Sequence, residues 1–363
     1  LSSDATAPIG TINTYHKNIL FVAGDNSWPS RVYFSNLGLI NTWTVTDFFD
    51  ASAGDGTRVT GLFSAYDNLY VFKEKSIWCL SGSDRDSFQL QKVVDNIGTL
   101  SQQSITSVNN LIYFTTAQGD NAIYDGAYAV KFLSQKIRNT IGGLNFNRAS
   151  KALGIGFSTY KYVDNDYYVA VSELGSGTHN EILMFDTAHQ AWTKFSGLNP
   201  SSWTVAETTS GQYALTFGDY DGYIHQYPST GYYDGDVATS PIAAYYQTKW
   251  FRYPEISLGD KYFRLLKTYA NSESSGTQLT IELKSDYQTS GNTYIDDLNQ
   301  SGAVWGTAVW GIDKWSGQYL ITDRIEVITG GTQMFQLKYS NGVVNQGFTI
   351  HGFENYIEPT DRI

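Results

Sequence analysis

Two carboxylates lie close together in one glycine-bounded turn, at a spacing that could bind a cation. The turn, residues 218–222, has the sequence Gly-Asp-Tyr-Asp-Gly and carries Asp219 and Asp221. Short calcium loops use carboxylates at this spacing, although a complete calcium site needs more oxygen ligands than two side chains supply. The same sequence is common in hairpin turns, with Asp-Gly at the tip. The sequence therefore leaves two alternatives at Asp219 and Asp221, a calcium ion or a plain turn.

The other patterns that would indicate catalysis do not occur in the sequence. A glycosidase needs two carboxylates at a set separation, and Glu207 is the best single acid on a predicted inner strand. As a lone acid, Glu207 is expected to be a solvated or hydrogen-bonded strand end. Metal-binding His-x-x-x-His pairs, phosphate-binding glycine loops and serine nucleophile elbows are missing. The sequence predicts no catalytic residue, no resident metal, no cofactor, and a protein that is not an enzyme.

Composition favours β-structure and excludes several kinds of partner. Aromatic residues make up 15% of the 363 residues and charged residues 16%, a balance that favours strands over long solvated helices. The net charge of −11 disfavours nonspecific binding of nucleic acid through a basic surface. The single cysteine, Cys79, excludes an internal disulfide and is expected to be a small buried side chain. No stretch reaches the roughly 18 apolar residues of a membrane-spanning helix, so no membrane partner is expected.

A repeat of short apolar runs organises the first two thirds of the chain. Each run follows a polar residue, and the five runs start at Asn18, Asn68, Asn110, Asp166 and Gln212, separated by 50, 42, 56 and 46 residues. Each is followed by a turn and a second run, which predicts a β-hairpin, and weaker strands such as Trp43–Val45 flank the hairpins. Four strands per unit of this size are typical of a β-propeller blade.

The repeat predicts five blades, at residues 9–50, 58–94, 104–137, 151–196 and 203–230, within a propeller domain spanning residues 1–235. A sixth blade would be supplied by chain preceding Leu1. Only Leu133 to Ile141 could form a short helix, which would end at the glycine pair 142–143. The alternative is an irregular β-sandwich whose spacing is coincidental.

Residues 236–363 predict a second domain, an antiparallel β-sandwich that follows the all-β propeller. Its strands are longer and alternate more cleanly, as in residues 278–284, where Leu279, Ile281 and Leu283 share one face. Six strands are expected, at residues 243–251, 262–269, 278–284, 319–328, 333–339 and 348–353.

Three tryptophans lie between the sandwich strands, at Trp305, Trp310 and Trp315. One interpretation is a loop packed over the sandwich by its aromatic rings. The other is an exposed surface that contacts a partner subunit or a sugar.

Several strings in the first half resemble propeller-bearing structural proteins of tailed bacteriophages, such as tail nozzle, tail tubular and packaged-DNA stabilisation proteins. They are Pro29–Gly38, Asp55–Leu62 followed by Leu69–Trp78, Asn96–Thr99, Ser104–Val108, Leu111–Phe114 and Ala129–Ile137. The resemblance implies a structural virion protein in a phage tail, without catalytic mechanism, that forms a ring with copies of itself, a hexamer, around the DNA exit channel. It also implies contacts with other tail proteins such as an adaptor or a fibre, and genomic DNA that passes without specific binding.

An alternative from another class is a carbohydrate-binding or glycan-degrading propeller on a receptor-binding tail component. It predicts exposed tryptophans beside paired acids at one mouth of the ring. The phage-like strings disfavour a third alternative, a cellular scaffold propeller.

Overall fold

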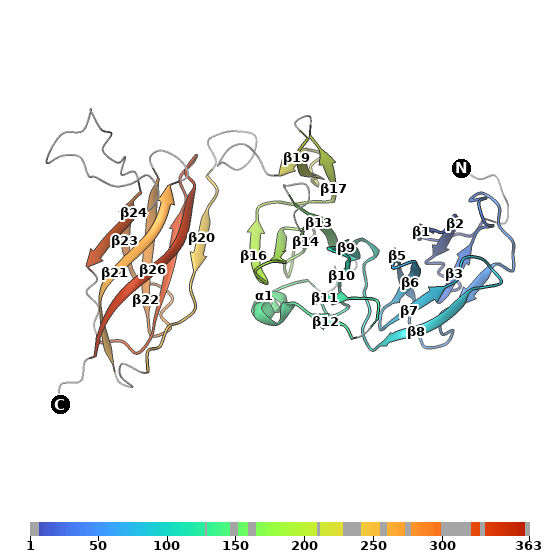
Figure 1. Cartoon of the computed structure of the whole chain (residues 1–363), viewed down its shortest axis with the longest axis horizontal. Helices are drawn as coiled ribbons and strands as arrows, with labels where there is room; N and C mark the ends of the chain where they lie inside the picture. The colour runs from blue at the N-terminus through green and yellow to red at the C-terminus, as the bar shows by residue number, and fades with distance from the viewer. Residues whose placement is uncertain are drawn as a thin grey trace. The chain divides into compact units, whose positions relative to one another are not determined.

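The computed structural model describes residues 7–127, 129–145, 152–158, 165–208, 211–227, 241–254, 260–272, 277–298, 331–359 and the backbone of 321–326. Contacts within the chain divide it into two units, Leu1–Pro228 and Ser229–Ile363. The predicted domain boundary at residues 235 and 236 lies outside the described residues. The fold is all-β, a β-propeller followed by an antiparallel β-sandwich, as predicted (Figure 1).

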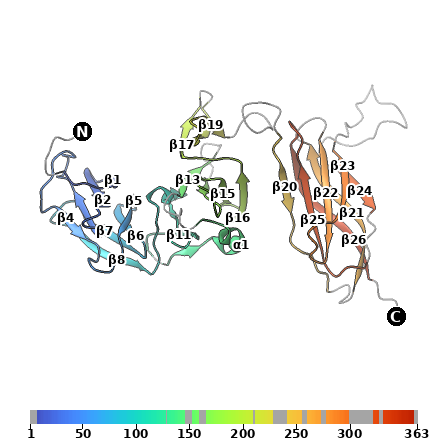
Figure 2. The ribbon, with the colours of Figure 1, turned by 180° about the vertical axis from the view of Figure 1, so that it is seen from behind.

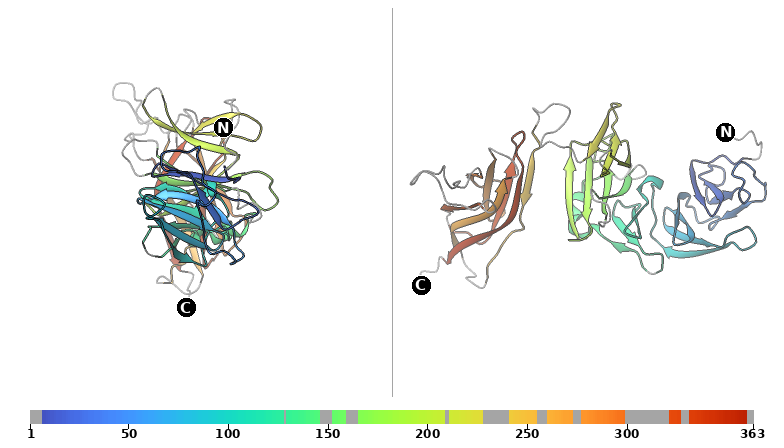
Figure 3. Two further views of the ribbon diagram at one scale, coloured as in Figure 1. Left: turned by 90° about the vertical axis from the view of Figure 1, so that its right-hand side faces the viewer. Right: turned by 45° about the horizontal axis from the view of Figure 1, so that its top comes forward.

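The first unit consists of successive antiparallel sheets whose strands are consecutive in sequence. Blade 1 contains β1 (Ile12–His16), β2 (Ile19–Ala23), β3 (Arg31–Phe34) and β4 (Phe48–Asp50); blade 2 contains β5 (Val59–Ala65), β6 (Asn68–Lys73), β7 (Ser76–Ser81) and β8 (Gln89–Asp95). Blade 3 contains β9 (Thr106–Val108), β10 (Leu111–Thr115), β11 (Asn121–Tyr124) and β12 (Lys131–Phe132); blade 4 contains β13 (Leu153–Phe157), β14 (Asp166–Val171), β15 (Glu181–Asp186) and β16 (Ala191–Ser196). Blade 5 contains three described strands, β17 (Ser202–Glu207), β18 (Tyr213–Gly218) and β19 (Ile224–Tyr227). The blades follow one another in chain order along a curve, which Figures 2 and 3 show from other sides.

The hydrophobic cores of this unit lie between neighbouring blades. In β6, Leu69 and Val71 pack toward blade 1, whereas the alternate residues Tyr70 and Phe72 pack toward blade 3. Strand β14 does the same between blades 3 and 5. Successive side chains of a strand point to opposite faces, and both faces of these sheets are buried. This explains why the repeat is a continuous apolar run and does not alternate with polar residues.

Polar contacts and a close backbone approach join the blades near their inner strands. Short η1 (Gln102–Ser104) precedes β9, and the Gln102 amide exchanges two hydrogen bonds with Leu62 of β5. The Ser101 hydroxyl donates to the carbonyl oxygen of Ala152 just before β13, at 2.7 Å. A Cβ atom on Gly154 would stand 2.4 Å from the carbonyl oxygen of Ser104, so a glycine is needed where these two backbones meet.

One prediction for the first unit is wrong and another is confirmed. The fourth strand of blade 1 is Phe48–Asp50, and the predicted strand Trp43–Val45 is wrong. Residues 39–42 and 44–47 instead form turns, closed by the Thr42 N–Leu39 O and Asp47 N–Thr44 O hydrogen bonds. The predicted short helix is present as η2 (Ser134–Ile137) and α1 (Arg138–Gly142). Among the described residues, no helix has the length and apolarity that a membrane crossing requires.

The second unit is a two-sheet sandwich. One sheet has the order β20 (Ala244–Gln247), β25 (Phe335–Asn341), β22 (Gln278–Ser285) and β23 (Asn292–Asp297); the other has β24 (Ile321–Glu326), β21 (Lys261–Ser272) and β26 (Phe348–Pro359). Leu279, Ile281 and Leu283 are buried in its core, as their alternation predicts. The six predicted strands are found, and β23 is an additional strand that the sequence did not predict. Trp305, Trp310 and Trp315 lie outside the described residues.

Candidate functional site

A cleft of about 680 Å³ opens between blades 1 and 2, and its lining is divided almost evenly between polar and apolar groups. Its walls come from the start of β1, the β2–β3 turn, the linker between the two blades, the end of β6 and the segment before β9. The lining residues that bear charged or amide side chains are Asp25, Asn26, Arg58, Glu74 and Gln102. The cleft is thus a place where several hydrogen-bonding side chains from separate segments converge.

Asp25 is an anion held in a defined orientation on one wall. Its Oδ1 accepts a hydrogen bond from the Ser27 N–H at 2.8 Å, and its Oδ2 accepts one from the Tyr33 hydroxyl at 2.9 Å. These hydrogen bonds lower the pKa of Asp25 below its ordinary value, and the bond from the Ser27 N–H has the largest effect. Asp25 is therefore a fixed carboxylate acceptor at neutral pH.

An exposed ion pair, Arg58 and Glu74, also lines the cleft. Arg58 Nε lies 3.2 Å from Glu74 Oε1, and the Arg58 side chain is 66% exposed. Pairs with this much exposure are weak, since water and salt screen them. The guanidinium and the carboxylate can therefore exchange this contact for contacts with a ligand.

Trp28 belongs to the same turn as Asn26 and Pro29, which line the cleft, and it is 54% exposed. The Arg31 guanidinium lies 4.2 Å from its ring centroid and 3.6 Å from that of Phe48. Two hydrogen bonds to the Asp50 carboxylate, at 2.9 and 3.0 Å, fix Arg31 in this position. The indole is thus an exposed aromatic ring that contacts a fixed guanidinium, on the turn that contributes Asp25 and Asn26 to the cleft.

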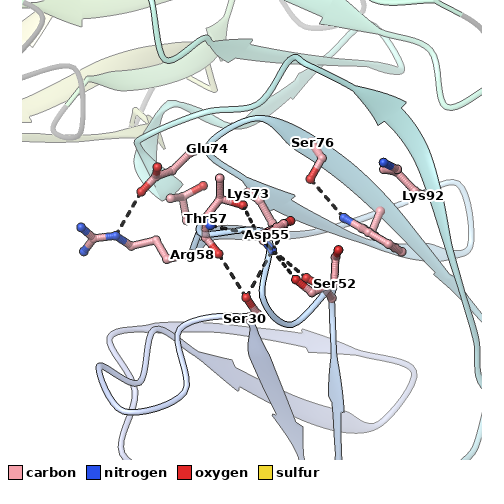
Figure 4. A network of polar contacts seen from close by, with 12 residues as sticks. Ser30, Ser52, Asp55, Thr57, Arg58, Lys73, Glu74, Ser76 and Lys92 are labelled. Atoms are coloured by element: carbon pink, nitrogen blue, oxygen red, sulfur yellow. Dashed lines mark hydrogen bonds and ion pairs between the residues drawn. The ribbon is translucent and has the colours of Figure 1, made fainter.

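A buried lysine lies behind the wall that carries Arg58 (Figure 4). Lys73, the last residue of β6, has no exposed surface, and its Nζ donates to both Asp55 carboxylate oxygens at 2.7 and 2.8 Å. Burial alone would raise the pKa of Asp55, but hydrogen bonds from Lys73 and Thr57 outweigh it and the pKa is lowered. Lys73 and Asp55 therefore form a charged pair beneath the cleft.

Asp219 and Asp221 lie in a hairpin turn, the plainer of the two alternatives that the sequence leaves. Asp219 Oδ1 accepts the N–H groups of Asp221 and Tyr223, and its Oδ2 lies 2.9 Å from His225 Nε2. These contacts make the hairpin turn, and no group of three possible metal ligands occurs among the described residues. Glu207 is exposed at the end of β17.

A second pair of acids lies in blade 4. Glu181 is buried, and its Oε2 is 3.0 Å from Lys194 Nζ, which is also 3.8 Å from Glu173 Oε1. Burial raises the pKa of Glu181, and Lys194 only partly offsets this. The lysine between the carboxylates makes this an internal ion cluster of the blade.

Sequence reasoning missed Asp25, Arg58 and Glu74 because they lie on separate turns and strand ends and form no motif. One signal was available. Lys73 ends the apolar run Leu-Tyr-Val-Phe of β6, and a lysine in a strand buried on both faces requires an acidic or carbonyl partner.

No family model and no curated protein matches the sequence. Three solved structures resemble the chain over most of its length. An exo-β-1,3-galactanase from Phanerochaete chrysosporium, solved with β-1,3-galactotriose, is 8% identical with a TM-score of 0.34, and the match covers 98% of each chain. A family 43 arabinoxylan arabinofuranohydrolase from Bacillus subtilis, solved with cellotetraose, is 10% identical with a TM-score of 0.25, covering 93% of this chain and 76% of that one. A further glycoside hydrolase is 9% identical with a TM-score of 0.22, covering 95% and 96%.

The interpretation of the chain as a structural tail-ring protein that is not an enzyme is contradicted by this finding, since these three structures are glycoside hydrolases and none of the three is a virion protein. With identities of 8–10% and TM-scores of 0.34 or lower, they transfer no substrate and no residue role to this chain. A function must therefore be argued from the chain's own cleft.

Proposed function

We propose that the propeller is carbohydrate-active and that the cleft between blades 1 and 2 binds the glycan. The observation that carries this proposal is the convergence of Asp25, Glu74 and Arg58 on one cleft, one of whose lining turns also carries the exposed Trp28. Sugar hydroxyls both donate and accept hydrogen bonds, so they suit a cleft that offers fixed carboxylates, amides and a guanidinium together. An exposed indole adds an apolar face for the C–H side of a sugar ring.

The charges of the cleft select among glycans. Two carboxylates, Asp25 and Glu74, line it against one guanidinium, Arg58, which already contacts Glu74. An acidic sugar would place a third carboxylate among these groups. Neutral or amine-bearing glycans are therefore expected to bind more tightly than uronic or sialic acid glycans.

The same carboxylates define what chemistry the cleft can supply. Asp25 stays ionised at neutral pH, so it can orient a sugar hydroxyl or accept a proton from water. Glu74 is a second carboxylate that lines the same cleft, and a glycosidase uses two carboxyl groups on either side of the scissile bond. Because the cleft has two carboxylates, the experiment tests for hydrolysis of the bound glycan as well as for binding.

The experiment is a glycan-array screen of the protein, followed by calorimetry and a reducing-sugar release assay on the glycans that bind. Asp25→Asn and Glu74→Gln keep the shape of the side chains and remove the charges, and each should weaken binding at least roughly tenfold. Glu207→Gln is the matched control, because Glu207 is an exposed acid on blade 5. The proposal fails when the wild-type protein binds no neutral or amine-bearing glycan, or when the two cleft variants bind as the control does.

A location in the virion, self-assembly into a ring and contacts with other tail proteins remain predictions from the resemblance of residues 29–137. They are compatible with a glycan-binding propeller on a receptor-binding tail component, and electron microscopy of purified particles would test them.

A further inference from the structure

We infer that Lys73 is a positioning residue, whose buried ammonium group fixes the linker Ser52–Arg58 and thereby the wall of the cleft that carries Thr57 and Arg58. This inference rests on the proposed carbohydrate-binding function, and it adds a residue that does not contact the cleft itself.

The ammonium group of Lys73 is surrounded by oxygen atoms from the preceding blade and the linker. Besides the two Asp55 oxygens, Nζ donates to the Ala51 carbonyl at 2.7 Å and to Ser30 Oγ at 3.2 Å, and the Ser52 carbonyl lies at 3.4 Å. Lys73 comes from blade 2, whereas Ser30 directly precedes β3 and Ala51 directly follows β4, both strands of blade 1. Figure 4 shows Lys73 and Ser30. One cation thus joins both blades to the linker between them.

The linker needs such an external tie because its backbone is unusual. Ser52, Gly54 and Gly56 have positive φ values of 55°, 94° and 74°. A Cβ atom at Gly54 or Gly56 would meet nothing within 4 Å, so these parts of the linker do not pack against the protein. Segments with little packing open easily unless specific polar contacts hold them.

Asp55 links Lys73 to the cleft wall, because its carboxylate contacts both Lys73 and Thr57. Its Oδ1 accepts hydrogen bonds from Thr57 N at 2.9 Å and Thr57 Oγ1 at 2.8 Å. The Thr57 carbonyl in turn accepts a bond from Ser30 Oγ at 3.1 Å. Hydrogen bonds thereby hold the N–H, the hydroxyl and the carbonyl of Thr57, and this fixes the backbone from which Arg58 extends.

Lys73 and Glu74 hold the linker from opposite sides. Successive residues at a strand end point to opposite faces, so Lys73 turns inward to Asp55 while Glu74 turns outward to Arg58. Without the ammonium group, the Asp55 carboxylate and the Ala51 carbonyl lose their donor, and the linker no longer presents one conformation. A ligand then has to order the wall as it binds, which weakens its affinity.

The test compares Lys73→Met, which keeps side-chain length and removes the charge, with Lys194→Met, which removes a lysine from the ion cluster of blade 4. Amide hydrogen exchange is measured by mass spectrometry over residues 52–58 and over β10, together with the affinity for the glycan found in the array screen. For Lys73→Met we expect exchange at least roughly tenfold faster over residues 52–58, an unchanged rate over β10, and glycan binding weakened at least roughly tenfold. Lys194→Met should leave the linker and the affinity unchanged.

Chemical rescue separates a role of the charge from a role of packing. Lys73→Ala removes the atoms that n-propylammonium contains, so this ion should slow linker exchange and restore binding, whereas 1-propanol should not. Equal rescue by both compounds would overturn the inference, and so would an unchanged linker exchange rate in folded Lys73→Met.

Three further outcomes each have a defined meaning. Faster linker exchange with unchanged affinity would show that the linker does not position the cleft, and it would overturn the inference. Should Lys73→Met fail to fold, Asp55→Asn is measured in its place, and unchanged exchange there has the same meaning. When the wild-type protein binds no glycan, the proposed function fails, while hydrogen exchange and rescue still decide whether Lys73 fixes the linker.

Discussion

Gln102 pairs with Leu62 as a residue of a neighbouring strand would. Its Oε1 accepts the Leu62 N–H at 2.6 Å and its Nε2 donates to the Leu62 carbonyl at 3.0 Å, although Gln102 precedes blade 3 and Leu62 lies in blade 2. An inner strand has no partner strand on its axial side, so its backbone groups there need other partners. A side-chain amide supplies both a donor and an acceptor with one residue.

Gln102→Leu should therefore destabilise the propeller. The substitution keeps the size of the side chain but leaves the buried Leu62 N–H and carbonyl without these partners, which costs about 1–3 kcal/mol. Urea unfolding measures the loss. Gln103→Leu is the control, because Gln103 is the exposed neighbour in the same turn. Equal stability of the two variants would contradict the strand-like role of Gln102.

Gly154→Ala should destabilise the contact between blades 3 and 4. The added Cβ would stand 2.4 Å from the carbonyl oxygen of Ser104, and a backbone atom cannot move away as a flexible side chain can. Overpacking of this kind costs about 1–3 kcal/mol. Thermal unfolding compares it with Gly177→Ala, where a Cβ meets nothing within 4 Å. A Tm for Gly154→Ala equal to that of the control would show that the blades can separate without loss.

Glu181→Gln should change how stability depends on pH. Because burial raises the pKa of Glu181, the folded state keeps a proton that the unfolded state has lost between the ordinary value of 4.5 and the higher folded value. In this window, stability of the wild type falls as pH rises. The variant lacks this decrease, so the difference between its free energy of unfolding and that of the wild type should shift in favour of the variant as the pH rises above 4.5. Parallel curves from urea unfolding would contradict the burial effect, and Glu207→Gln serves as the exposed control.

Added calcium or a chelator should leave the Tm of the protein unchanged. Both oxygens of the Asp219 carboxylate already have partners in the turn, two N–H groups and His225. Asp219→Ala should lower the Tm, because it removes the carboxylate that accepts these hydrogen bonds, whereas Asp221→Ala should change it little, since Asp221 contributes its backbone N–H. A rise in Tm with calcium that Asp219→Ala abolishes would establish a metal site instead of a plain turn.

Much of the fold could be predicted from sequence because a strand buried on both faces must be apolar throughout. The runs at Asn68 and Asp166 therefore marked the second strands of blades 2 and 4 directly. In the sandwich, the alternation at residues 278–284 identified a strand with one buried face. Strand β23, Asn-Thr-Tyr-Ile-Asp-Asp, was missed because it is a polar strand at the edge of its sheet.

The candidate site could not be predicted in the same way. Asp25 lies in a turn of blade 1 and Glu74 just after a strand of blade 2, and only the packing of the two blades brings them to one cleft. Their separation in sequence follows no motif. Lys73 was the detectable residue, since a cation that ends a fully buried apolar strand must have a partner, but the sequence does not say that Asp55 is that partner.

The order of strands within each sheet also determines when each unit can form during synthesis. In the propeller, neighbouring strands follow one another directly, as β5 to β8 do, so a blade can complete its hydrogen bonds soon after its own residues leave the ribosome. In the sandwich, Tyr245 pairs with Ser340 and Lys261 pairs with Pro359. Those early strands must wait, unpaired, for segments translated much later, and this interval is when the nascent chain is most exposed to aggregation.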